Sequence, residues 1–245
     1  ESVDRVYEDL KPLYEGLQCH VRAELNEFYG DEVVPNEGSI PAHVLGNMWA
    51  QSWANVYDLV YQEESTGKSI DLTKVINDRG LTEVEMVEIA EDFFLSLGFE
   101  PLEDTFWERS LFVKPVDRNV VCHASAWDIN PKTQDLRIKM CIEKNAEDFV
   151  TIHHELGHIF YYQAYAHQPS VFQSGANDGF HEAVGDLLSL SITPNYLEKI
   201  GFVTKEEADL AKENSIAFLM KQALDGVVPT PWTLMLDKWR MAVFN

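Results

Sequence analysis

The chain has 245 residues, 45% of them hydrophobic and 24% charged, which is typical of a globular protein and excludes a disordered, collagen-like or low-complexity chain. Its formal net charge of −22 repels nucleic acid and anionic lipid, so we expect neither as a partner. No apolar run approaches the roughly 20 residues that span a bilayer, and the acidic first residues differ from the basic start of a signal peptide. Because no repeat, linker or charge block divides the chain, we expect one unit.

Apolar residues at three- and four-residue steps predict that helices dominate the fold. The first predicted helix begins near Val3 and stops at Gly30, and a second covers residues 45–59. A third begins with a capping box formed by Thr82 and Glu85 and ends at Gly98. Further helices are predicted over residues 146–166, 180–191 and 204–224, and from residue 231 onward.

Two β-prone runs interrupt the helical pattern. They cover residues 119–127 and 136–142 and are separated by Asn130 and Pro131, so they predict a short hairpin. The chain contains three cysteines, Cys19, Cys122 and Cys141, so at most one internal pair can form. Cys122 and Cys141 lie in the two β-prone runs and could join them.

The strongest chemical signal is an HExxH motif at residues 154–158, inside an apolar-periodic stretch that predicts a helix. Because residues four apart share a helix face, His154 and His158 can bind one metal ion, while Glu155 is turned enough to reach an attacking water. By chance alone, a chain of this composition would contain roughly 0.03 such motifs. The alternative is an ordinary solvated helix face of histidine and glutamate.

A catalytic zinc needs a third protein ligand, and Glu182 is the best candidate. It lies in an apolar-flanked helical segment that follows His158 closely enough in the chain to return to the first helix. Asp186, four residues further, shares its face and is suited to accept a hydrogen bond from the far nitrogen of a ligand histidine. The alternative makes both acids solvent-facing, but the flanking apolar residues favour a mostly buried helix, in which acids need partners.

Four motifs in this order resemble those of the angiotensin-converting enzyme family, zinc dipeptidyl carboxypeptidases of the gluzincin type, and the resemblance covers essentially the whole chain. The motifs are PAH with LGNMWAQ at residues 41–51, VCHASAWD at 121–128, HHELGH at 153–158, and GAN with GFHEA at 175–183.

The resemblance implies a mainly α fold, a helical zinc-peptidase architecture with one short β-hairpin beside the active site. It implies zinc bound by His154, His158 and Glu182, with Glu155 as the proton acceptor of the attacking water and Asp186 behind a ligand histidine. It also implies a disulfide between the cysteines of the hairpin, Cys122 and Cys141, which leaves Cys19 single and indicates an extracellular, secreted protein.

Substrate contacts are expected at the hairpin. In the family, the strand that matches His123, Ala124 and Ala126 pairs with the substrate backbone. Main-chain hydrogen bonds to a strand edge are a general way of holding an extended peptide. Taken without its motif, His123 would more simply be a structural histidine.

Gln51 bears on the length of the product. Its match in the dipeptide-releasing members binds the terminal carboxylate of the substrate, whereas the related single-residue carboxypeptidase has the longer arginine there. Glutamine therefore favours release of dipeptides from peptides with a free C-terminus. The alternative is an ordinary surface glutamine on a helix.

The resemblance also implies that residues 1–245 are part of a single peptidyl-dipeptidase catalytic domain, incomplete at both ends. The family's oxyanion-stabilising tyrosine and histidine match no residue of this chain, so we expect the 245 residues alone to be inactive. Chloride dependence is unsupported, because family chloride ligands also fall outside the match.

The sequence thus predicts a zinc metallopeptidase that releases dipeptides from the C-terminus of peptides, with the water at zinc activated by Glu155. One alternative is a single-residue carboxypeptidase of the same family. Another is a catalytically silent homologue that binds peptides, although the intact Glu155 disfavours it.

Overall fold

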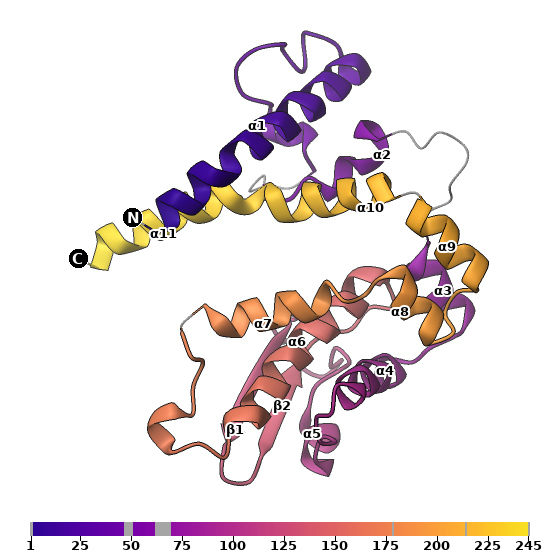
Figure 1. The fold of residues 1–245 in the computed structure, drawn as a ribbon, viewed down its shortest axis with the longest axis vertical. Coiled ribbons are helices and arrows are strands. Elements are labelled where there is room, and N and C mark those ends of the chain that lie inside the picture. Colours follow the sequence, from indigo (N-terminus) through magenta and orange to yellow (C-terminus); the bar gives the residue numbers. More distant parts are fainter. Residues whose placement is uncertain (1, 47–50, 62–69, 178, 214, 245) are drawn as a thin grey trace. The chain divides into compact units, whose positions relative to one another are not determined.

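The computed structural model describes residues 2–46, 51–61, 70–177, 179–213 and 215–244. The described chain is mainly helical and contains a two-stranded antiparallel sheet, as predicted (Figure 1). It divides into two compact units, Glu1–Ser69 with Asp209–Asn245, and Ile70–Ala208. None of the described helices combines the length and the apolar character needed to cross a membrane.

The first unit contains residues from both ends of the chain. Its long helix α1 (Ser2–Tyr29) has the predicted bounds to within one residue, and α11 (Pro229–Phe244) begins two residues before the predicted start. The other helices are α2 (Tyr57–Val60) and α10 (Ser215–Gln222), with short helical turns at Ala42–Val44, Ala54–Val56 and Ala223–Val227. Their buried apolar residues, among them Val21, Leu25 and Leu224, form one core.

One predicted helix in this unit, over residues 45–59, is wrong. Gly46 has a φ of +72°, which ends the helical turn before it, and the described residues 51–53 are also not helical, so the next described helical turn begins at Ala54. Three described apolar residues of this segment still face inward, since Leu45, Trp53 and Val56 are buried. Their spacing reflects burial by turns and short helical pieces; residues 47–50 lie outside the described residues.

The second unit has a core of large apolar side chains beneath the hairpin and α6. Its helices are α3 (Leu72–Asp78), α4 (Glu83–Ser96), α5 (Asp104–Arg109), α6 (Ala146–Tyr165), α7 (Phe180–Ser189) and α8 (Pro194–Lys199), with a turn at Ser170–Phe172. The predicted capping box of α4 is present, since Thr82 and Glu85 exchange hydrogen bonds. Phe94 of α4 stacks on Phe160 of α6 with ring centroids 4.4 Å apart.

The segment predicted as one helix over residues 204–224 is described as two helical stretches, and residue 214 between them lies outside the described residues. The two stretches are α9 (Lys205–Glu213), which crosses the boundary between the units, and α10.

The hairpin is present, but its first strand is displaced from the prediction. Strand β1 covers Ser125–Asn130 and β2 covers Asp135–Lys139. They pair in antiparallel register, with Ala126 opposite Ile138, and an irregularity lies between Asp128 and Asn130. Residues 119–124 lie before the sheet and form no strand, and a disulfide joins Cys122 of this segment to Cys141 with their Cα atoms 5.0 Å apart. The remaining cysteine, Cys19, is exposed.

Candidate metal centre

Helix α6 carries the HExxH motif and is the best-anchored element of the second unit. Its N-terminus is capped by Asn145, whose side chain accepts a hydrogen bond from the backbone N–H of Asp148 at 2.7 Å. Phe149, Ile152 and Ile159 are fully buried in the core. Residues 154, 155 and 158 are therefore presented by a helix that the core holds in place.

A close approach between α6 and α7 brings the two parts of the site together. A Cβ atom added to Gly157 would lie 2.9 Å from the Cα of Gly185, and one added to Gly185 would lie 2.8 Å from the ring of His154. Real side chains cannot occupy such positions, so both glycines are required for this packing. The sequence patterns gave neither glycine a role, although glycines inside predicted helices are a signal of close packing between helices.

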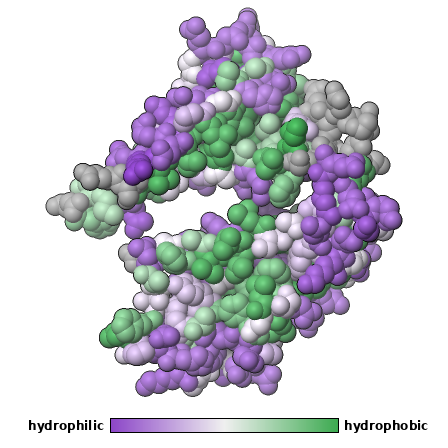
Figure 2. Space-filling model, in the orientation of Figure 1, coloured by the Kyte–Doolittle hydropathy of each residue, from purple (hydrophilic) through white to green (hydrophobic). Residues whose placement is uncertain are grey.

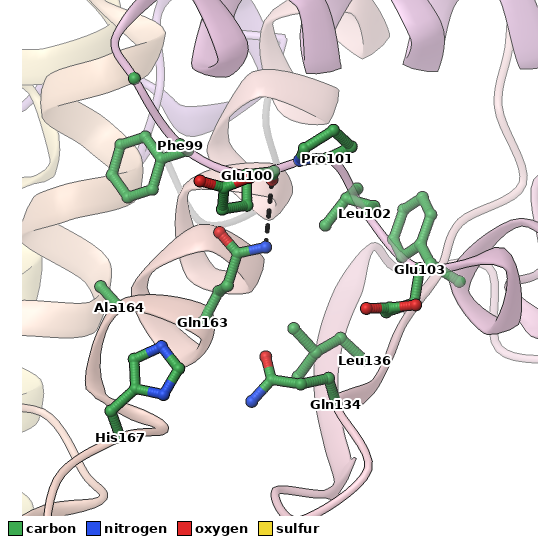
Figure 3. A pocket seen from close by; sticks show the side chains of 12 residues that line it. Phe99, Glu100, Pro101, Leu102, Glu103, Gln134, Leu136, Gln163, Ala164 and His167 are labelled. Carbon is green, nitrogen blue, oxygen red and sulfur yellow. Dashed lines mark hydrogen bonds between the residues drawn. The ribbon is translucent and has the colours of Figure 1, made fainter.

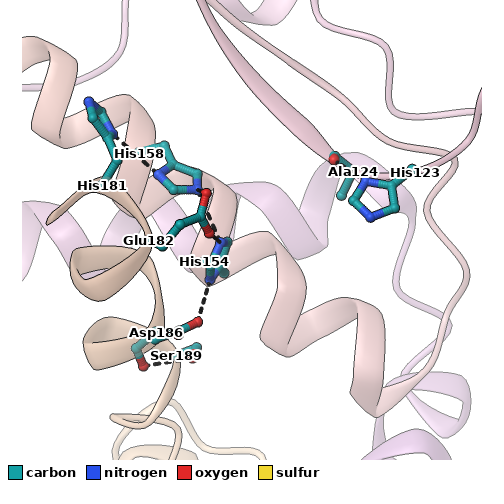
Figure 4. Close-up of polar contacts among 8 residues, drawn as sticks. All are labelled: His123, Ala124, His154, His158, His181, Glu182, Asp186 and Ser189. Atoms are coloured by element: carbon teal, nitrogen blue, oxygen red, sulfur yellow. Dashed lines mark hydrogen bonds and ion pairs between the residues drawn. The ribbon is translucent and has the colours of Figure 1, made fainter. Parts of the chain in front are cut away.

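The two histidines of the motif and Glu182 converge on one point (Figure 4). The Nε2 atoms of His154 and His158 are 3.0 Å apart, and carboxylate oxygens of Glu182 lie 3.3 Å from His154 Nε2 and 3.8 Å from His158 Nε2. Donor atoms bound tetrahedrally to zinc at about 2.0–2.1 Å are separated by about 3.3 Å. Two nitrogens and one carboxylate oxygen at this spacing fit a zinc ion with one further position open.

The far nitrogens of both imidazoles also have partners. Asp186 Oδ1 lies 3.0 Å from Nδ1 of His154, and Nδ1 of His181 lies 3.3 Å from Nδ1 of His158. Asp186 was predicted for such a contact from its spacing, whereas His181 was not predicted. Only the folded structure shows that the ring of His181 lies next to that of His158. Burial lowers the pKa of His158, which favours the neutral imidazole that a metal requires.

Glu155 lies beside this cluster and is only 6% exposed. Its Oε2 atom has no hydrogen-bond partner among the described residues. Burial raises the pKa of Glu155 above its ordinary value, and the nearby charge of His154 opposes that rise. A buried carboxylate with a free oxygen is suited to accept a proton from a reacting group.

The adjacent His153 has a different environment from the rest of the motif. It is fully buried, its Nδ1–H donates to the carbonyl oxygen of Phe149 at 2.8 Å, and its Nε2 accepts from the hydroxyl of Tyr196 at 3.2 Å. Burial lowers the pKa of His153 to about 4, so it is neutral at physiological pH. It therefore packs α6 into the core.

Helix α7 is much more exposed than the sequence indicated. The side chains of Glu182 and Asp186 are 71% and 73% exposed, and Gly185 is the only buried residue of this helix. Phe180, Leu187 and Leu190 are also exposed, and apolar surface is visible along α7 in the space-filling view (Figure 2). The expectation of a mostly buried α7 is therefore wrong in the described chain.

The hairpin residues expected to contact substrate lie in the same unit as the metal cluster. Ala124 and Ala126 are partly buried against the core, and His123 Nδ1–H donates to the carbonyl oxygen of Ala124 at 2.8 Å (Figure 4). Within the described residues, β1 pairs with β2 alone, so its other edge has no strand partner.

Gln51 belongs to the first unit, and the structure does not place it relative to this cluster.

A separate hollow of about 330 Å³ lies elsewhere in the second unit (Figure 3). Phe99, Leu102, Gln134 and Gln163 are among its lining residues, and the Gln163 amide donates to the carbonyl oxygen of Glu100 at 3.1 Å. It shares no lining residue with the metal cluster.

Comparison with known proteins places this geometry in context. The peptidase family model described as angiotensin-converting enzyme matches residues 1–245. The chain is 47% identical to the angiotensin-converting enzyme of Bos taurus and 44% identical to that of Haematobia irritans exigua, and each alignment covers the whole chain. The aligned parts make up 19% and 40% of those relatives, so the chain spans less than half of their length.

Proposed function

The chain belongs to the angiotensin-converting enzyme family, and from this premise we propose that the protein containing it is a zinc-dependent peptidyl-dipeptidase. The observation that carries the proposal is the convergence of His154, His158 and Glu182 within 4.8 Å of one another. Two imidazoles and a carboxylate with an open position are the donor set of a hydrolytic zinc site. In this proposal the two units of the chain belong to one catalytic domain.

The proposed chemistry assigns one role to each residue. His154, His158 and Glu182 would hold a zinc ion, which would supply Lewis-acid polarisation of the scissile carbonyl group. Glu155 accepts a proton at its unpaired Oε2 from the attacking water and delivers it to the leaving amine nitrogen. The raised pKa of Glu155 supports this role, because a carboxylate of higher pKa is a stronger base and accepts the proton of the water more readily.

The open edge of β1 suits the backbone of an extended peptide, with His123, Ala124 and Ala126 alongside it. Gln51 is proposed to bind the terminal carboxylate, a role that rests on the family resemblance alone. Peptides with a free C-terminus are therefore the proposed substrates.

An extracellular, secreted location is part of the proposal. The disulfide between Cys122 and Cys141 supports it, because disulfides persist mainly in oxidising compartments, and the family relationship agrees.

Digestion of a decapeptide by the full-length protein, followed by mass spectrometry, tests the proposal. We expect loss of two residues at a time from the C-terminus, no cleavage when that terminus is amidated, and no cleavage after zinc is removed by a chelator. Single-residue steps would instead indicate a carboxypeptidase. Peptide binding without any cleavage would indicate a silent homologue.

A further inference from the structure

We infer that His181 is a positioning residue that fixes the orientation and tautomer of the ligand His158, through a hydrogen-bonded chain that ends at Tyr165. The inference deepens the proposed function and rests on the metal site described there. It concerns the residue behind His158, for which the sequence offered no candidate.

This series of hydrogen bonds joins three side chains, those of His158, His181 and Tyr165. Nδ1 of His158 lies 3.3 Å from Nδ1 of His181, and Nε2 of His181 lies 2.9 Å from the hydroxyl of Tyr165. In Figure 4 the ring of His181 lies on the side of His158 that faces away from Glu182. Both nitrogens of His181 are thus engaged, one by the proposed ligand and one by a tyrosine.

The positions of the protons follow from the geometry. Nε2 of His158 faces His154 Nε2 and Glu182, so it must keep its lone pair to bind a metal. The proton of His158 is then on Nδ1 and donates to Nδ1 of His181. His181 in turn carries its proton on Nε2 and donates it to the Tyr165 oxygen. One assignment satisfies every contact, and it leaves the metal-facing nitrogen of His158 free.

The ring of His181 is held by aromatic packing. The ring centroids of Tyr161 and Tyr162 lie 4.7 and 4.6 Å from that of His181, and Tyr165 is at 5.8 Å. On the chain segment before α7, a Cβ atom on Gly175 would lie 3.3 Å from Cδ2 of His181. The ring therefore has little freedom to rotate away from His158.

The two ligand histidines are consequently oriented by different kinds of partner. His154 has an exposed carboxylate, Asp186, and His158 has a neutral imidazole packed among tyrosines. Outer partners of this kind typically affect metal affinity about 10–100-fold. His181 should thus matter to zinc affinity even though it does not touch the metal.

The test is an equilibrium zinc competition against a chromophoric chelator, performed on the full-length protein. His181→Phe retains the aromatic packing and removes both nitrogens, whereas His181→Asn loses the ring and retains an oxygen near the position of Nδ1. Tyr165→Phe removes only the hydroxyl group that contacts His181 Nε2. Tyr162→Phe is the matched control, because it removes a hydroxyl from a packed tyrosine for which no hydrogen bond to His181 is found.

We expect His181→Phe to lower zinc affinity about 10–100-fold, with a smaller loss for Tyr165→Phe and none for Tyr162→Phe. His181→Asn should bind zinc more tightly than His181→Phe. A packing role alone predicts the reverse order, because phenylalanine fills the space better. Folding of each variant is checked by circular dichroism.

Unchanged zinc affinity in a folded His181→Phe variant, or tighter binding by His181→Phe than by His181→Asn, would overturn the inference while leaving the metal site intact. Absence of zinc binding by the wild-type protein would instead refute the proposed function. The two failures are therefore distinguishable in one experiment.

Discussion

The two helices that carry the candidate metal ligands are built in opposite ways. In α6, half of the 20 residues are buried, including Glu155 and His158. In α7, Gly185 alone is buried among ten residues. The proposed base and two ligands therefore come from a helix fixed in a core, whereas Glu182 and Asp186 come from an exposed helix that approaches α6 closely at Gly185.

Because of this difference, substitutions in α6 and in α7 should have different consequences. Changes on the core side of α6 should reduce both the stability and the function of the protein. Changes on the ligand face of α7 should reduce metal binding with little loss of stability, because few of its side chains are buried.

The largest expected effects distinguish the base from the third ligand. Glu155→Gln should reduce turnover by about 10²–10⁴-fold and leave zinc bound, because it removes a proton acceptor but no ligand. Glu182→Gln should weaken zinc binding far more than Glu155→Gln does, because it removes a ligand and its charge. Metal analysis and peptide cleavage are measured on both variants. Full zinc content in Glu182→Gln would remove Glu182 from the ligand set.

Phe160→Ala tests the core side of α6. The Phe160 ring is 1% exposed and stacks on Phe94, so its loss should lower the free energy of unfolding by about 3–5 kcal/mol. Denaturant unfolding of the variant and the wild type measures this change. A loss below about 1 kcal/mol would contradict the view of α6 as a core-anchored helix.

Gly185→Ala tests the contact between the helices. The added methyl group would press on the ring of His154. We expect this overpacking to cost about 1–3 kcal/mol, mainly as a loss of zinc-binding free energy. Gly16→Ala in α1 is the control, since a Cβ atom there meets nothing within 4 Å. It should leave zinc affinity unchanged. Equal zinc affinities in the two variants would show that the close approach is not needed.

Asp186→Asn should have the smallest of these effects on zinc affinity, within the range of about 10–100-fold. The amide can still contact His154 Nδ1 but lacks the negative charge. Chelator competition measures the change, with Asp117→Asn as a control, because Asp117 is an exposed acid paired with Arg118. Identical affinities for the Asp186→Asn and wild-type proteins would mean that Asp186 has no influence on the ligand.

The sequence predicted the features that depend on local pattern. Helix α6 and its motif follow from spacing along one helix, and the capping box of α4 lies within four residues. The position of α7 was also predicted. Local spacing was sufficient for these because each depends on interactions within a single helix.

Features that depend on the fold could not be read from the sequence. The apolar residues between Leu45 and Leu59 have helical spacing, yet Gly46 turns the chain, and turns and short helical pieces bury Leu45, Trp53 and Val56. The residues before β1 are as β-prone as the strand itself but lack a pairing partner in the described sheet. The contact between His181 and His158 exists only once α7 packs on α6.

Anomalous X-ray diffraction at the zinc edge, on crystals of the full-length protein, tests the central claim most directly. The account predicts one zinc peak at about 2.0–2.2 Å from His154 Nε2, His158 Nε2 and a carboxylate oxygen of Glu182. Zinc bound elsewhere, or coordinated without Glu182, would contradict it.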